Sequence, residues 1–134
     1  MTGPAVAIRL KIPDNEAYTA LTALRRLGVD VARVERAVIY AQAAAGNGDF
    51  VDRIARNETL FNSNKHVLEV RENAIPLTGE TWIEELAAND PSRPRRYVAW
   101  RLFSAGNEPV DAAILTDAAT KLLCNPAIER AHFG

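Results

Sequence analysis

The sequence predicts an α+β protein in which helices cover one face of an antiparallel sheet. Residues 5–71 alternate between strand periodicity and helix periodicity, in the order strand, helix, strand, helix, strand, and a similar order returns in the second half. The 134 residues are 48% hydrophobic and 25% charged, which suits a globular chain able to bury a core without staples. This succession of elements is typical of a ferredoxin-like sandwich.

The first strand and the first helix have clear boundary signals. Residues 5–12 alternate between two sets of side chains, as in a half-buried strand, and Pro13 stops them. Asp14 is expected to cap a helix over residues 14–28, which Gly28 ends in the left-handed conformation.

The next elements complete the first half. Residues 31–43 favour extended chain, and the change of parity between Val34 and Ile39 predicts a bulge or a break into two strands. An amphipathic helix is expected over residues 50–58, followed by a strand at 66–71.

The second half contains a strongly β-forming segment rich in aromatic residues. Thr78 is expected to cap a helix before it, and both faces of the aromatic segment are apolar, so both should be covered. Turns are expected at residues 46–48 and 89–91. The predicted elements of this half are a helix over 78–88, a polar connector over 92–96, a strand over 97–104, a helix over 110–124 and a strand near 127–133.

The two halves are expected to be ferredoxin-like units, residues 1–72 and a partial unit at 73–134. A shift of 63 residues places Leu60-x-Asn62 on Leu123-x-Asn125, although identities between the halves are at chance level. An internal duplication and an unrelated second half both stay open. No flexible linker separates the halves, so they should pack together with roughly eight strands.

Charge and composition exclude several classes of protein. The formal net charge of −1 argues against a nucleic-acid binder, which needs a strong positive field. Cys124 is the only cysteine, which excludes an intrachain disulfide and a four-cysteine metal site and favours a reducing, cytoplasmic compartment. Neither a leader peptide nor a run of about 18 apolar residues is found, so no membrane association is expected.

The sequence carries no strong catalytic motif. A nucleophile needs a base, and the only histidines are His66 and His132. A pair between Cys124 and His132 is conceivable, but a buried structural thiol is the more common arrangement. Because metal-ligand spacing, a glycine-rich phosphate loop and a nucleophile elbow are all missing, we expect no catalytic residues, no metal and no cofactor.

Two groups of side chains suggest binding. Arg93, Arg95 and Arg96 could contact a phosphate or carboxylate, although a solvated connector is the simpler interpretation. Four aromatic residues could line a ligand cavity, although core packing is the usual role of such residues. They are Trp82, Tyr97, Trp100 and Phe103, and the residues predicted as core are Leu24, Ile54, Trp100, Leu102, Ile114 and Leu123.

Two stretches resemble a known family. The segment KLLCNPAIE at 121–129 resembles the closing signature KLLANPVIE of the PurS-type small subunit of phosphoribosylformylglycinamidine synthase, and residues 58–63 look like a degraded copy. Residues 23–30, followed by Val34-Glu35-Arg36, are similar to that family's passage from its first helix to its second strand. The resemblance implies a chain without catalytic residues that forms homo-oligomers through its sheet and bridges the glutaminase and synthetase subunits of a purine-biosynthesis amidotransferase.

The resemblance also implies interface residues. It places Asn62, Asn125, Pro126 and Ile128 near oligomer contacts, whereas a purely structural interpretation makes the two asparagines left-handed caps that end their helices. Two other functions stay open. One is an ACT-like sensor that binds a small ligand where paired sheets meet, and the other is a small dimeric α+β-barrel enzyme with a cavity near Trp100 and Cys124.

Overall fold

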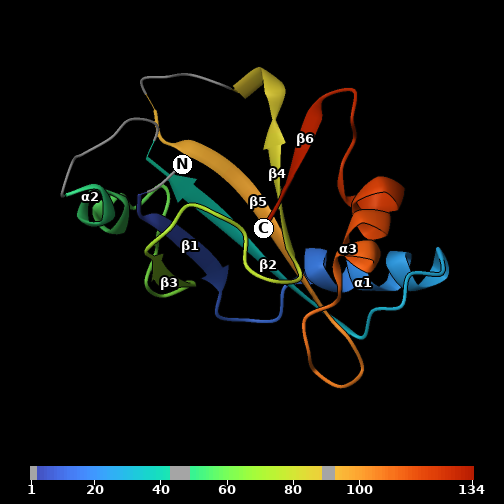
Figure 1. The fold of residues 1–134 in the computed structure, drawn as a ribbon. Helices are drawn as coiled ribbons and strands as arrows, with labels where there is room; N and C mark the ends of the chain where they lie inside the picture. Colours follow the sequence, from blue (N-terminus) through green and yellow to red (C-terminus); the bar gives the residue numbers. More distant parts are fainter. Residues whose placement is uncertain (1–2, 43–48, 89–92) are drawn as a thin grey trace.

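The strands of the chain form one antiparallel sheet in the order β3-β1-β2-β5-β4-β6. The computed structural model describes residues 3–42, 49–88 and 93–134 (Figure 1), and the turns predicted at 46–48 and 89–91 lie outside these residues. The α+β class is confirmed, with six strands in the described part of the chain where roughly eight were expected. The strands are β1 (Ala5–Leu10), β2 (Arg33–Ala41), β3 (His66–Arg71), β4 (Glu80–Glu85), β5 (Arg95–Phe103) and β6 (Glu129–Phe133).

The first helix, α1 (Asn15–Arg26), begins and ends as its local sequence predicts. The side chain of Asp14 accepts hydrogen bonds from the backbone N–H groups of Glu16 and Ala17 at 3.0 and 3.2 Å. Gly28 has a φ of 84°, the left-handed conformation that a side chain would disfavour. Short-range chemistry therefore fixes both ends of this helix.

The second strand is continuous, so the predicted bulge or break is wrong. All nine residues of β2 pair in one register with β5, from Arg33 opposite Phe103 to Ala41 opposite Arg95. The change of parity has another cause, because both faces of β2 are covered. Val34 packs against one core cluster and Ile39 lies in another on the opposite face.

The predicted helix over residues 78–88 is also wrong. Residues Glu80–Glu85 form strand β4, which pairs with β5 on one side and β6 on the other, and only the short 3-10 turn η1 (Leu86–Ala88) follows it. Five consecutive residues of β4 are buried, from Glu80 to Glu84. An interior position in the sheet overrides the local capping signal of Thr78, because pairing on both sides satisfies the backbone of the strand.

The other helices are shorter than predicted. Helix α2 covers Phe50–Arg56, and α3 covers Ala112–Ala118 before the chain widens into the π-helical segment η2 (Ala119–Leu123). A backbone bond from Cys124 N–H to the carbonyl of Ala119 closes η2. The C-terminal strand then forms the edge of the sheet, as expected near residues 127–133.

Helices α1, α2 and α3 of the described residues lie on one face of the sheet, which we call the helical face. Cross-strand pairing places Val6, Ile8, Val38 and Leu102 on this face. Val6, Ile8 and Leu102 cluster there with buried residues of the helices. The predicted core residues Leu24, Ile54, Leu102 and Leu123 are confirmed as buried, and Trp100 and Ile114 pack partly buried against the same core.

The opposite face is crossed by the connection between β3 and β4, residues 72–79, which we call the strap (Figure 1). Alanines and a few large side chains line this strap face, and Ala74 of the strap packs against them. The rings of Trp82 and Tyr97, which belong to this layer, pack at an angle of 40° with their centroids 5.1 Å apart. The buried members are Ala5, Ala7, Ala37, Ile39, Ala41, Trp82, Tyr97 and Ala99.

The two sides of the sheet have the same strand arrangement. Outward from the centre, the first half contributes β2, β1 and β3, and the second half contributes β5, β4 and β6 in the same sequence of positions. Strands β2 and β5 have nine residues each, and their middle residues, Ala37 and Ala99, pair with one another. Helices of seven residues begin nine positions after each strand, at Phe50 and Ala112. Within the described residues, α1 has no counterpart between β4 and β5.

Candidate functional site

Two similar corners connect helices to edge strands. In the first, the carbonyl of Asn62 accepts hydrogen bonds from the backbone N–H groups of Lys65 and His66, and its side-chain Oδ1 accepts one from Asn64 at 2.9 Å. The N–H of Asn62 in turn donates to Nδ1 of His66 at 3.0 Å. The asparagine thus closes an Asx turn that leads into β3.

The second corner repeats these contacts with different neighbours. The carbonyl of Asn125 accepts from Ile128 and Glu129, its Oδ1 accepts from Ala127 at 3.1 Å, and its N–H donates to Oε1 of Glu129 at 2.8 Å. Neither asparagine is left-handed, because Asn107 is the only described residue other than glycine with a positive φ. The predicted left-handed cap is therefore wrong, and both residues act through their side chains in a turn.

Replacing Asn125 by alanine removes the acceptor for the N–H of Ala127, so we expect a loss of about 0.5–2 kcal/mol in unfolding free energy. Asn62→Ala is the matched change, and it should cost a similar amount. Denaturant unfolding measures the loss, and sedimentation at equal concentrations measures association. A changed assembly state without a comparable loss of stability would contradict a purely structural role and support an interface.

Two predicted interface residues follow in the second corner. Ile128 is 59% exposed, a large apolar side chain in water, and Pro126 lies in the turn before it. Leu122, on the last helical turn before the corner, is 41% exposed. The corner therefore presents apolar surface beside the ordered backbone of the Asx turn, and its role as an interface stays a prediction.

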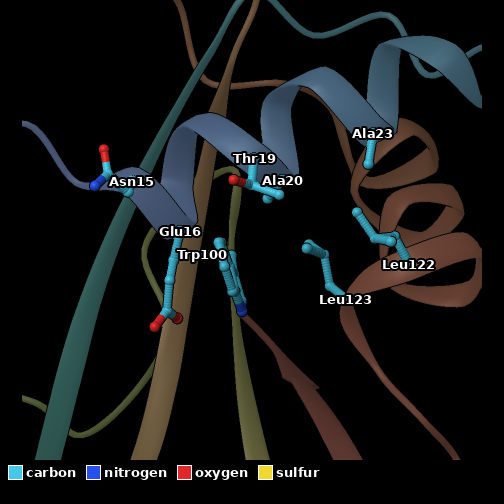
Figure 2. A pocket seen from close by; sticks show the side chains of 8 residues that line it. All are labelled: Asn15, Glu16, Thr19, Ala20, Ala23, Trp100, Leu122 and Leu123. Carbon is cyan, nitrogen blue, oxygen red and sulfur yellow. The ribbon is translucent and has the colours of Figure 1, made fainter.

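An apolar groove lies on the helical face between α1 and η2, with a volume of about 390 Å³ (Figure 2). Figure 2 shows Trp100 beneath α1, with Leu122 and Leu123 reaching toward the same space from η2. Small side chains of α1 leave this space open, and polar residues lie at its other end. The lining residues are Asn15, Glu16, Thr19, Ala20, Ala23, Trp100, Leu122 and Leu123.

The four aromatic residues considered as a cavity lining do not share one cavity, because they are divided between the two faces of the sheet. Because side chains alternate along a strand, Trp100 faces the helices, whereas Tyr97 and Phe103 face the strap side. Trp82 is buried beside Tyr97 in the core of the strap face. A cavity near Trp100 and Cys124 was also considered. The groove is lined by Trp100 but not by Cys124, so it matches this expectation only in part.

The arginine run is divided in the same way. Arg95 and Arg96 are neighbours on β5, so their side chains point to opposite faces of the sheet. Arg95 lies 3.9 Å from a carboxylate oxygen of Glu84, and Arg93 lies in the exposed segment before the strand. Arg95 and Arg96 therefore do not converge on one anion, and a contact made by the run stays a prediction.

Cys124 and His132 are engaged separately. Nε2 of His132 lies 2.9 Å from Oε1 of the buried Glu84, and the imidazole ring packs edge-on against Tyr97. Burial raises the pKa of the Cys124 thiol, and the negative charge of Glu129 raises it further. A raised thiol pKa leaves less thiolate at neutral pH, so this cysteine is a poor nucleophile.

We therefore expect native Cys124 to react slowly with a thiol reagent at pH 7, and to react faster as the pH rises toward its elevated pKa. Iodoacetamide labelling followed by mass spectrometry measures the rate, and the urea-unfolded chain gives the reference rate of the exposed thiol. Since the chain contains no other cysteine, all the label reports on Cys124. A native rate equal to that of the unfolded chain at pH 7 would contradict this assignment.

A charged hollow of about 160 Å³ lies on the strap face above Ala37 and Ala99. Arginine and glutamate side chains from several strands surround it, and Leu77 of the strap closes one side. No local pattern in the sequence indicates this site, because its residues are spread along the chain and only the register of the sheet brings them together. The lining residues are Arg9, Glu35, Arg36, Ala37, Glu69, Arg71, Leu77, Glu80, Ala99 and Arg101.

The described residues contain no group of three or more histidine, cysteine, aspartate or glutamate side chains placed to hold a metal ion. None of the helices seen in residues 3–42, 49–88 and 93–134 is long and apolar enough to cross a membrane. Comparison with known proteins gives no matching family model, no matching curated protein and no matching solved structure.

Proposed function

We propose that the chain is a non-catalytic, PurS-like assembly subunit in which two ferredoxin-like units, residues 1–72 and 73–134, are fused. The observation that carries the proposal is the symmetric strand arrangement of the sheet, in which the two halves are related by an approximate two-fold axis at the pair of Ala37 and Ala99. An antiparallel pair of equivalent strands is what two copies of one unit form when they associate about a two-fold axis. A fused chain therefore supplies in one molecule the sheet that a homodimer would build.

The two Asx corners support the same proposal. Asn62 and Asn125 have the same hydrogen-bond pattern although their neighbours differ, and each leads into an edge strand. A duplicated unit would retain such a pattern where backbone geometry depends on it, while its other residues diverge. The absence of a counterpart of α1 among the described residues between β4 and β5 is then a divergence of the second unit.

Assembly with other proteins fits the surface chemistry. Ile128 is exposed in the corner that resembles the PurS signature, and burial and the charge of Glu129 raise the pKa of the nearby Cys124 thiol, which disfavours its nucleophilic form. The proposed partners are further copies of the chain and the glutaminase and synthetase subunits of a purine-biosynthesis amidotransferase. In this role the chain positions other subunits and performs no chemistry itself.

Affinity purification of the tagged chain from its native host tests the proposal. We expect the two amidotransferase subunits to be recovered with the wild-type chain and to be lost with Ile128→Asp. Ile12→Asp is the matched control, because Ile12 is also exposed, at 69%, and lies outside the corner. Recovery of neither subunit with the wild-type chain, or equal recovery with both variants, would contradict the proposed partners or the proposed surface, respectively.

A further inference from the structure

We propose that the charged hollow on the strap face binds a small anion that carries a carboxylate or phosphate group. The hollow lies over the central strands β2 and β5, where the small side chains of Ala37 and Ala99 form its floor. Its volume of about 160 Å³ is below the roughly 300 Å³ of the smallest pockets for drug-sized ligands, so a compact metabolite fits better than a nucleotide. The inference does not depend on the proposed assembly role.

Every glutamate that lines the hollow already has an arginine partner. Glu80 binds both terminal nitrogens of Arg71, at 2.6 and 2.9 Å, and Glu69 binds Nε of the same arginine at 3.2 Å. Glu35 pairs with Arg33, its neighbour on the same face of β2. Each of these carboxylates therefore lies beside a guanidinium, with Arg71 shared by Glu69 and Glu80. The lining as a whole has four arginines against three glutamates, so it is not short of positive charge.

Two arginines of the lining have no carboxylate partner in the described part of the chain. The side chain of Arg9 makes no hydrogen bond or ion pair with the described residues, and Arg101 donates through Nε to the carbonyl of Thr78 at 3.0 Å. Arg36 contributes to the wall, but its guanidinium lies on the helical face beside Asp14 and Glu16. The Nε of Arg36 has no hydrogen-bond partner among the described residues, but this side chain belongs to the helical face. On the strap face, the unused donors of the hollow come from Arg9 and Arg101.

This arrangement selects an anion by its donor chemistry. A guanidinium presents a planar set of N–H donors that matches two oxygens of a carboxylate or phosphate. Arg9 and Arg101 approach from β1 and β5, on either side of β2, so a ligand above Ala37 would lie between them. The half-buried position of both arginines strengthens such contacts relative to contacts in open water.

Thermal unfolding of the full chain, with sodium phosphate or succinate titrated at constant ionic strength, tests the proposal. We expect one of the two anions to raise Tm in a saturable way, because a ligand that binds only the folded state stabilises it. Saturation by phosphate identifies a phosphoryl ligand, and saturation by succinate identifies a carboxylate. Arg9→Gln and Arg101→Gln should each weaken binding about tenfold or more, since each removes charge-assisted hydrogen bonds.

Arg25→Gln is the control, because Arg25 is exposed on α1 and lies away from the hollow. In Ala99→Leu, the larger side chain should fill the hollow and abolish binding while both arginines remain. Denaturant unfolding of each variant without ligand verifies that it folds. If Ala99→Leu does not fold, the two arginine variants decide. A rise in Tm that does not saturate for either anion, or that is equal in wild type, Arg9→Gln and Arg101→Gln, would overturn the proposal.

Discussion

Replacing Glu80 by alanine is expected to lower the unfolding free energy by about 3–5 kcal/mol, the largest effect of any single change proposed for this protein. The side chain of Glu80 is 2% exposed and accepts four hydrogen bonds. Two come from Arg71, one from the backbone N–H of Leu77 at 3.0 Å and one from the indole Nε1 of Trp82 at 2.8 Å. One carboxylate thereby joins β3, the strap and β4.

The loss of stability is large because the hydrogen-bond donors that pair with Glu80 remain in place without their acceptor. Burial alone would lower the pKa of the Arg71 guanidinium, but its bonds to Glu80 and Glu69 outweigh burial and hold that pKa above its ordinary value. Without Glu80, the positive charge of Arg71 remains with only the peripheral Glu69 beside it. The indole N–H of Trp82 also loses its acceptor in a buried position.

Urea unfolding of Glu80→Ala measures the effect, with Glu69→Gln as the control. Glu69 touches the same arginine but is largely exposed, so its replacement should cost less than about 1 kcal/mol. The double variant Arg71→Met with Glu80→Met should be more stable than Glu80→Ala, because it leaves no unpaired charge. Equal unfolding midpoints for Glu80→Ala and Glu69→Gln would show that the buried carboxylate does not hold the strap.

Truncating Leu102 to alanine is expected to cost about 2–5 kcal/mol. This leucine is fully buried on the helical face, in the cluster that joins α1, α3 and η2 to the sheet. The substitution leaves a cavity among elements that are held from several sides, so the neighbours can collapse only partly. The backbone bonds of Leu102 to Gly79 and Val110 persist, which confines the loss to the side chain.

Denaturant midpoints measure the effect of this truncation as well. Leu122→Ala is the matched control, since it removes the same atoms from a side chain that is 41% exposed. We expect the control to cost less than about 1 kcal/mol, because a large part of the Leu122 side chain already meets water. A loss for Leu102→Ala no greater than that of the control would contradict the placement of the core.

Elements with local signals could be predicted from the sequence. The strand at His66–Arg71 has the predicted bounds, and Asp14 and Gly28 delimit the first helix as expected. In each case the cause lies within a few residues of the element itself. A side chain that accepts from the next turn, or a residue that favours a left-handed backbone, acts whatever the rest of the chain does.

Strand β4 could not be predicted in this way. Thr78 precedes a segment with apolar residues at helical spacing, and nothing local shows that Trp82 pairs with Ala99 on one side and His132 on the other. The burial of Glu80 likewise depends on Arg71, which reaches it across the strap face. Pairing between distant segments decides the conformation of such a segment, and propensity alone does not reveal it.

The charged hollow has the same origin. Arg93, Arg95 and Arg96 stand out in the sequence because they are close together, yet neighbouring positions on a strand place the side chains of Arg95 and Arg96 on opposite faces. Arg9 and Arg101 lie far apart along the chain and reach one hollow only because β1, β2 and β5 are neighbours in the sheet. Runs of like residues are therefore a poor guide to a site on a sheet, and register is the better one.

The central pairing of β2 with β5 has a consequence for how quickly the chain folds. Its middle residues, Ala37 and Ala99, are brought together from distant parts of the chain, so a long loop must close before the sheet gains this contact. Small proteins dominated by such pairings fold in about milliseconds to seconds, whereas an isolated helix forms in about a microsecond or less. We therefore expect the pairing of β2 with β5 to be a slow step of folding. Helix α1 can form and unfold many times before these two strands pair.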